Sequence, residues 1–220
     1  LRAPLRAIES LSEWIEEDLA GKLSTESVEH LRLLRGRVRR MNALLNDLLQ
    51  YARAGRAGTE LSEVDTNVLV AEIADSLALS PRMELRTTQL PRLRTAVSPL
   101  RQVFHNLFSN ALKHHDRQRG TLSVAAEHHN GVWEFTVADD GPGIPEQHRA
   151  RVFEMFETLK PRDELESSGM GLALVKKLVE SHGGAVSLEN AEPRGTLVRF
   201  TWPVEAPLES PPDGGGSVLQ

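Results

Sequence analysis

Four polar residues share one face of a predicted helix over residues 98–113, which proline opens in its first turn. Asn106, Asn110, Lys113 and His114 follow one another at helical spacing, so their side chains point the same way. Amide oxygens are hard ligands of the kind Mg²⁺ prefers, and Mg²⁺ commonly accompanies phosphates. The face therefore predicts a site for magnesium and phosphate. An exposed polar helix face is the alternative that this pattern alone leaves open.

Two glycine-rich segments follow along the chain. Residues 139–144 read Asp-Asp-Gly-Pro-Gly-Ile directly after an apolar run, and residues 167–171 read Ser-Ser-Gly-Met-Gly at a helix start. Glycines after a strand let backbone approach a flat ligand, and Asp139 could accept a hydrogen bond from an amino group. Glycines at a helix N-terminus present free N–H groups to an anion. A tight surface turn and an ordinary helix start are the respective alternatives.

Composition excludes several other functions. The chain has 26 Lys and Arg against 31 Asp and Glu, a formal net charge of -5, and no cysteine. Disulfides and cysteine-held metal sites are therefore excluded, and a reducing, cytoplasmic compartment is expected. A general nucleic-acid binder needs a concentrated basic surface, so nucleic acid is not an expected partner. No apolar run approaches the roughly 18 residues of a membrane span.

Residues 1–57 are predicted to form a helical hairpin that breaks at 21–25, with Ser24 or Thr25 capping the second helix. A two-helix hairpin has little core, so a second copy is expected to complete a dimeric four-helix bundle. The hairpin could instead fold onto its own chain. The second helix carries an apolar seam in strict three-four alternation: Leu31, Leu34, Val38, Met41, Leu45, Leu48 and Ala52.

After an expected linker at 58–64, the patterns alternate between helix and strand up to residue 203. This region is predicted to be an α/β sandwich, so that the whole chain is of the α+β class. Residues 204–220 are rich in Pro, Gly and Ser and are expected to be a disordered tail. Helices are predicted over 65–79, 98–113 and 171–182, and strands over 83–88, 121–129, 132–139, 186–189 and 196–202.

Taken together, these segments resemble the catalytic domain of histidine kinases. In order, they match its asparagine box, its two glycine boxes and its terminal Gly-Thr, here at 195–196, and residues 151–156 stand where the family keeps a phenylalanine box. The resemblance covers about 65–203 and implies a Bergerat-type ATP-binding fold. Residues 1–8 resemble the segment after the phosphoacceptor histidine in the dimerisation and phosphotransfer domain. The sequence of these motifs is most similar to that of soluble phytochrome-like and PAS-linked sensor kinases.

The resemblance assigns roles by position. It implies that Asp139 accepts from the adenine amino group, and that Asn110, helped by Asn106, binds magnesium. Lys160 and Arg162 lie in the expected lid, where either could stabilise charge on the γ-phosphate or simply be solvated. Asn106 and Lys113 join them as implied catalytic residues. The implied nucleotide contacts are Asn106, Asn110, Lys113, His114, Asp139, Gly141, Gly143, Ile144, Phe156, Gly169, Met170, Gly171, Leu172 and Thr196.

The implied activity is a sensor histidine kinase that uses ATP and magnesium. It would phosphorylate a bundle histidine and pass the phosphoryl group to an aspartate of a response-regulator receiver. The implied partners are a second copy through residues 1–57, that receiver, and a sensor domain upstream in the same chain. The phosphoacceptor is expected two residues before Leu1 and so is not in this sequence.

The alternatives to a kinase are a nucleotide-binding dimeric regulatory module and an ATPase of the same superfamily. Two residues bear on the mechanism. Related ATPases carry a glutamate that activates water where Asn106 stands, and an amide cannot take that proton. Ala3 stands where many kinases keep Thr or Asn for dephosphorylating the receiver, so weak phosphatase activity is predicted.

Overall fold

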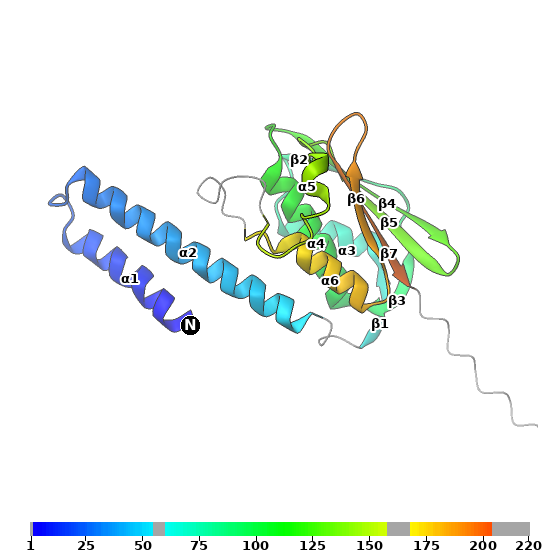
Figure 1. Ribbon diagram of the computed structural model, residues 1–220, viewed down its shortest axis with the longest axis horizontal. Coiled ribbons are helices and arrows are strands. Elements are labelled where there is room, and N and C mark those ends of the chain that lie inside the picture. The colour runs from blue at the N-terminus through cyan, green and yellow to red at the C-terminus, as the bar shows by residue number, and fades with distance from the viewer. Residues whose placement is uncertain (1, 55–59, 158–167, 204–220) are drawn as a thin grey trace, which may run out of the picture.

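The computed structural model describes residues 2–54, 60–157 and 168–203, and it has two parts (Figure 1). Helices α1 (Arg2–Asp18) and α2 (Thr25–Arg53) form the hairpin. Ser24 caps α2, because its hydroxyl accepts a hydrogen bond from the Ser27 N–H at 3.1 Å, as the sequence predicts. No helix in the described ranges is both long enough and apolar enough to span a membrane.

The second part is built on a five-stranded sheet in the order β2-β4-β5-β7-β6. Its strands are β2 (Met83–Thr87), β4 (Gly120–His129), β5 (Val132–Asp139), β6 (Val186–Asn190) and β7 (Thr196–Pro203). Strands β4 and β5 form a hairpin through Asn130 and Gly131, both at positive φ, and β2 pairs parallel with β4. The remaining pairings are antiparallel.

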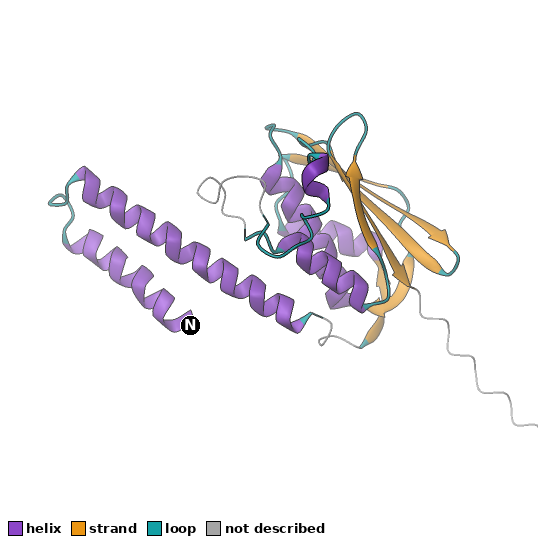
Figure 2. Ribbon diagram, viewed as in Figure 1, coloured by secondary structure: helices purple, strands orange, loops and turns teal. Residues whose placement is uncertain are grey.

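Three helices lie on one face of this sheet, between the sheet and the hairpin (Figure 2). They are α3 (Thr66–Ser76), α4 (Val97–His114) and α6 (Gly171–Ser181), and α4 packs between the other two. A short helix, α5 (Glu146–Arg149), follows the first glycine-rich segment. The predicted α/β sandwich is confirmed, and the predicted helices and strands match these bounds to within a few residues.

Two strands were not predicted, and they form a separate small sheet. Strand β1 (Leu61–Asp65) pairs antiparallel with β3 (Arg92–Ala96). The expected linker at 58–64 is therefore wrong for residues 61–64, where Val64 is buried. Both strands are only five residues long, and they are stable because they pair with each other and pack on the core, not because of local pattern. The expected tail at 204–220 lies outside the described residues.

An aromatic cluster holds α4 against the middle of the sheet. The Phe104 ring lies edge-on to Phe135 of β5 at 5.4 Å and to Phe200 of β7 at 5.5 Å. Phe135 and Phe200 are direct cross-strand partners whose rings stack at 5.2 Å. Because Phe104 and Phe108 lie four residues apart and are both fully buried, the face of α4 that carries them is fixed on the sheet.

Replacement of Phe104 by Ala is expected to lower the free energy of unfolding by about 3–5 kcal/mol, because it leaves a cavity in this cluster. Urea denaturation monitored by circular dichroism measures the change. Val68→Ala on α3 is the matched control, since Val68 is exposed and its loss is expected to cost less than about 0.5 kcal/mol. Equal effects of the two substitutions would show that the cluster does not anchor α4.

Candidate functional site

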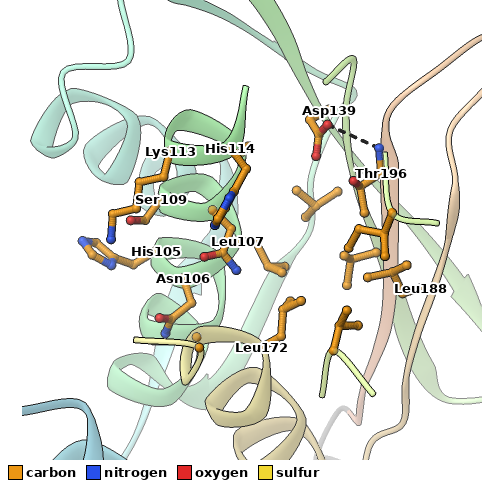
Figure 3. A pocket seen from close by; sticks show the side chains of 18 of the residues that line it. His105, Asn106, Leu107, Ser109, Lys113, His114, Asp139, Leu172, Leu188 and Thr196 are labelled. Atoms are coloured by element: carbon orange, nitrogen blue, oxygen red, sulfur yellow. Dashed lines mark hydrogen bonds between the residues drawn. The ribbon is translucent and has the colours of Figure 1, made fainter. Parts of the chain in front are cut away.

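A cavity of about 540 Å³ opens between α4, the N-terminus of α6 and the ends of the central strands (Figure 3). Its volume is within the range of small-ligand sites. The polar face of α4 forms one wall, and Asp139 and Thr196 lie across the cavity from it. Most of the residues singled out by sequence line it: Asn106, Asn110, Lys113, His114, Asp139, Gly143, Ile144, Gly169, Gly171, Leu172 and Thr196.

The α4 wall presents amide oxygens. Asn106 Nδ2 donates a hydrogen bond to the Gln102 carbonyl at 2.7 Å, which leaves its Oδ1 as an acceptor at the cavity. Asn110 lies beside Gly171, where an added Cβ would be 3.2 Å from Asn110 Oδ1 and 3.6 Å from Asn106 Oδ1. Glycine at 171 therefore lets the start of α6 approach both amides closely.

The N-terminus of α6 faces the same amides without a side-chain cap. Met170 occupies the N-cap position, and its side chain accepts no hydrogen bond from the helix. Gly169 precedes it at φ +67°, where an added Cβ would lie 2.6 Å from the Glu157 carbonyl oxygen. The first N–H groups of α6 and the positive end of its dipole are thus available to an anion at this end of the cavity.

Asp139 forms the opposite end of the cavity, at the last residue of β5. Its Oδ1 accepts hydrogen bonds from the Gly141 N–H at 2.9 Å and from the Thr196 N–H at 3.3 Å. Figure 3 draws the bond from Thr196. Within the described ranges, Oδ2 accepts no hydrogen bond. Burial raises the pKa of Asp139 above its usual value, although the two backbone donors oppose the shift. A donor from a ligand would restore part of the lost solvation.

His105 lies near Lys113 on the α4 wall (Figure 3). Burial lowers the pKa of His105, and the positive charge of Lys113 lowers it further. The imidazole is therefore biased towards its neutral form. His105 is a lining residue that the sequence analysis did not single out.

Three of the implied nucleotide contacts are not among the residues that line the cavity. Phe156 is 44% exposed at φ +66° and is absent from the lining, and its implied contact stays a prediction. Met170 is buried in the protein, and Gly141 contributes its N–H to Asp139 and not to the cavity wall. Lys160 and Arg162 lie outside the described residues.

Sequence reasoning missed contacts from the hairpin. Asp47 and Gln50 of α2 belong to the cavity lining, and Gln102 Nε2 donates to Gln50 Oε1 at 3.4 Å. The Lys177 ammonium of α6 lies 4.1 Å from the centre of the Tyr51 ring. In the sequence these α2 residues resemble ordinary solvated positions of a bundle helix. The apolar walls that sequence reasoning missed are Leu107, Ala111, Leu122, Val137, Val152, Leu188 and Val198.

The chemistry of the cavity is that of a site for an elongated ligand. One end offers a buried carboxylate between apolar walls, which suits a flat group that carries an amino donor. The other end offers amide oxygens and an uncapped helix N-terminus, which suit a phosphate and a hard cation together. The described residues contain no cluster of three His, Cys, Asp or Glu side chains placed to hold a metal. The amide oxygens of the cavity therefore suit a cation that takes its other ligands from the oxygens of a bound phosphate.

Comparison with known families agrees with this chemistry. Residues 95–206 match the family model described as histidine kinase-, DNA gyrase B-, and HSP90-like ATPase. Residues 1–57 match the model of the His Kinase A (phospho-acceptor) domain.

Individual relatives are similar over almost the whole chain. It is 27% identical to the phytochrome-like protein Cph1 of Synechocystis, over 93% of this chain and 28% of that protein. It is 30% identical to the signal transduction histidine-protein kinase AfsQ2 of Streptomyces coelicolor, over 98% and 42%. The crystal structure of full-length ShkA in complex with AMPPNP is similar with a TM-score of 0.67 and 30% identity, over 92% and 43%. The chain therefore spans less than a third of the first phytochrome-like relatives.

Asp139→Asn is expected to raise the melting temperature of the ligand-free protein at neutral pH. The raised pKa means that ionised Asp139 costs folding free energy above that pKa, and Asn keeps an oxygen for the two backbone donors. The gain in melting temperature of Asp139→Asn over the wild type is expected to be complete above the raised pKa. It is expected to fade as pH falls towards the ordinary pKa of an aspartate, about 3.9.

Differential scanning fluorimetry from about pH 4 to about pH 8 measures this difference. Asp75→Asn on α3 is the control, because Asp75 is exposed and lies outside the cavity lining. A lower melting temperature for Asp139→Asn across the whole range would refute the assigned burial cost.

Proposed function

We propose that this chain, which belongs to the histidine kinase-, DNA gyrase B-, and HSP90-like ATPase family, is the catalytic core of a sensor histidine kinase. Its reaction is phosphorylation of a histidine by ATP with magnesium, followed by transfer to an aspartate of a response regulator. The match of residues 1–57 to a phospho-acceptor domain supports the kinase over the ATPases of the same family.

One observation carries the proposal, which is the two-ended chemistry of the cavity. Asp139, whose Oδ2 accepts no hydrogen bond from the described residues, stands at one end, and the N-terminus of α6 beside Asn106 and Asn110 stands at the other. An adenine amino group fits the first end, and a magnesium-bound triphosphate fits the second. The cavity volume of about 540 Å³ suits a nucleotide of that length.

The residues of the adenine end bind and orient the base. Asp139 Oδ2 accepts the hydrogen bond that distinguishes an amino group from a carbonyl, and Ile144 and Leu172 supply apolar surface beside it. Thr196 holds the Asp139 carboxylate through its N–H.

The residues of the phosphate end neutralise charge and fix geometry. The α6 N–H groups cradle phosphate oxygens, Asn106 and Asn110 offer amide oxygens to magnesium, and Lys113 with His114 supplies polar groups beside them. ATP with magnesium supplies the γ-phosphoryl group when bound. Lys160 and Arg162 remain proposed lid cations. Because Asn106 cannot act as a general base, water is not activated there, which favours transfer to a protein nucleophile.

The hairpin supports the proposed homodimer through residues 1–57. Its two helices bury only Leu5, Ser12 and Val38 between them, beside ion pairs of Arg35 with Glu16 and Arg39 with Glu9. Apolar side chains left exposed on the two helices and on the turn between them match the surface that a second copy would cover: Ile8, Leu11, Trp14, Ile15, Leu19, Val28, Leu33, Leu34, Met41 and Leu48. Within the described residues, the end of α2 packs on the ATP-binding part, where α2 contacts α6 and Tyr51 lies under Lys177.

We place this activity in the cytoplasm, where ATP and response regulators are available. The proposed architecture has a hairpin at 1–57, a linker reduced to 58–60, a catalytic domain to residue 203 and a tail at 204–220. The sensor domain and the phosphoacceptor histidine are proposed to precede Leu1 in the same protein.

The proposal predicts protein-bound phosphate that is acid-labile and base-stable when the full-length protein is incubated with labelled ATP and magnesium. Asp139→Asn is expected to abolish the label, because the adenine acceptor is lost, and to weaken ADP binding by at least about tenfold. Autoradiography of gels after acid and base treatment measures the label, and isothermal titration calorimetry measures binding. Asp75→Asn is the matched control.

Other outcomes separate the alternatives. Bound nucleotide without label would favour a regulatory module in which ATP acts only as a conformational ligand. Release of free phosphate without protein label would favour an ATPase and would overturn the role given to Asn106.

The dimer is expected to dissociate when Leu34 and Met41 are both replaced by Glu. These exposed residues lie seven apart on one stripe of α2, and burying their charges against a second copy costs several kcal/mol. Sedimentation equilibrium measures the mass. Val68→Glu, an exposed apolar position on α3, is the control that should remain dimeric. A monomeric wild-type chain at micromolar concentration would contradict the proposed dimer.

A further inference from the structure

We propose that His115 is a positioning residue that holds the first glycine box so that Asp139 selects adenine. The inference rests on the proposed function, because it concerns the same base-binding carboxylate. His115 does not line the cavity, and it acts through Asp140, the residue after Asp139. It is thus a determinant of which base is bound, without contact to the base.

The His115 side chain is buried between the end of α4 and the start of the glycine box. The residue is the C-cap of α4, its side chain is only 2% exposed, and its Nε2 lies 3.0 Å from Asp140 Oδ1. Lys113 and His114, its two neighbours on the helix, line the cavity instead. At the end of α4, Lys113 and His114 therefore face the cavity, whereas His115 contacts the loop that follows Asp139.

The hydrogen bonds of the imidazole fix the direction of the link to Asp140. The Arg117 N–H donates to His115 Nδ1 at 3.1 Å, so the neutral ring carries its proton on Nε2 and donates to Asp140. When the ring is protonated, Nδ1–H faces the Arg117 carbonyl oxygen, also at 3.1 Å. The ring thus ties the end of α4 to Asp140 through its Nε2–H.

Asp140 carries the link to the backbone that follows β5. Its Oδ1 also accepts from the Thr121 N–H at 2.6 Å, and its own N–H donates to the Thr121 carbonyl at 3.3 Å. Asp140 thereby extends the β4–β5 pairing one residue past Asp139. The backbone on the C-terminal side of Asp139 is fixed, which limits how far the Asp139 carboxylate can shift.

The space for the imidazole is made by a glycine on β4. An added Cβ at Gly120 would lie 2.2 Å from His115 Nε2, so only glycine fits beside the ring. A second link starts one residue further along, where Asp116 accepts from Arg194 at 2.7 Å. Arg194 precedes Gly195 and Thr196, and the Thr196 N–H donates to Asp139 Oδ1. Both loops that hold Asp139 are therefore tied to the end of α4.

Selectivity follows from the position of Asp139 Oδ2. A carboxylate oxygen accepts from the amino group of adenine but repels the carbonyl oxygen that hypoxanthine carries at the same ring position. If the Asp139 carboxylate can shift, both its attraction for the adenine amino group and its repulsion of the hypoxanthine carbonyl oxygen become weaker. Loss of the His115 link is therefore expected to reduce the preference for adenine more than it reduces nucleotide affinity as a whole.

The test compares ADP and IDP binding by isothermal titration calorimetry on the whole chain. His115→Ala is expected to reduce the ratio of the two affinities by about tenfold, comparable to the loss of one hydrogen bond to a charged group. His115→Asn keeps a donor and is expected to retain most of the preference. Asp140→Ala breaks the same link from the other side, and it serves if His115→Ala does not fold. His129→Ala is the control, because His129 is an exposed histidine of β4 that bonds Glu127.

The outcomes distinguish this inference from the proposed function. If the wild type prefers ADP and both link-breaking variants lose ADP and IDP affinity equally, His115 is only structural and the inference is overturned. If the wild type binds neither nucleotide, or binds both equally, the adenine role of Asp139 fails, and the inference fails with it. Loss of preference in His115→Ala with retention in His115→Asn supports a positioning role.

Discussion

Phe104 of α4 packs edge-on against Phe135 and Phe200, and this contact determines which way the opposite face of the helix points. Rotation of a helix about its axis moves all its side chains together, so anchoring one face places the other. Asn106 and Asn110 reach the start of α6 for this reason, and Gly171 leaves them the room to do so. The chemistry of the cavity is thus a consequence of hydrophobic packing on the far side of α4.

The parts of the site that sequence predicted are those with a local signal. Helical spacing along α4 predicted its polar face, and glycines after a strand or before a helix predicted the two ends of the cavity. Strands β1 and β3 were missed because each is stabilised by the other, 30 residues away in sequence, with little local pattern. Asp47 and Gln50 were missed because their role depends on how α2 docks. Phe156 is absent from the lining, and no local pattern indicated its backbone at positive φ. His115 gave no signal, since only the folded protein brings it to Asp140.

Asp139 shows how binding and folding compete at one carboxylate. A buried acceptor with a free oxygen is ready for an amino donor, but its charge has lost water without gaining a full set of partners. The two backbone N–H groups compensate in part, whereas the negative charge of the neighbouring Asp140 adds to the cost. The site therefore keeps a destabilising group because that group is useful only when a ligand is present.

The hairpin contributes part of the wall of the cavity, since Asp47 and Gln50 of α2 lie in its lining and Tyr51 contacts Lys177. The affinity of the cavity for a ligand that reaches this wall therefore includes the free energy of the α2 contact. Thermodynamic reciprocity requires that such a ligand change the docking equilibrium of the hairpin by the same amount. A stimulus that bends or rotates α2 would then change the affinity of the proposed site for nucleotide. Bound nucleotide would in turn shift the docking equilibrium of α2 and so the conformation of the hairpin.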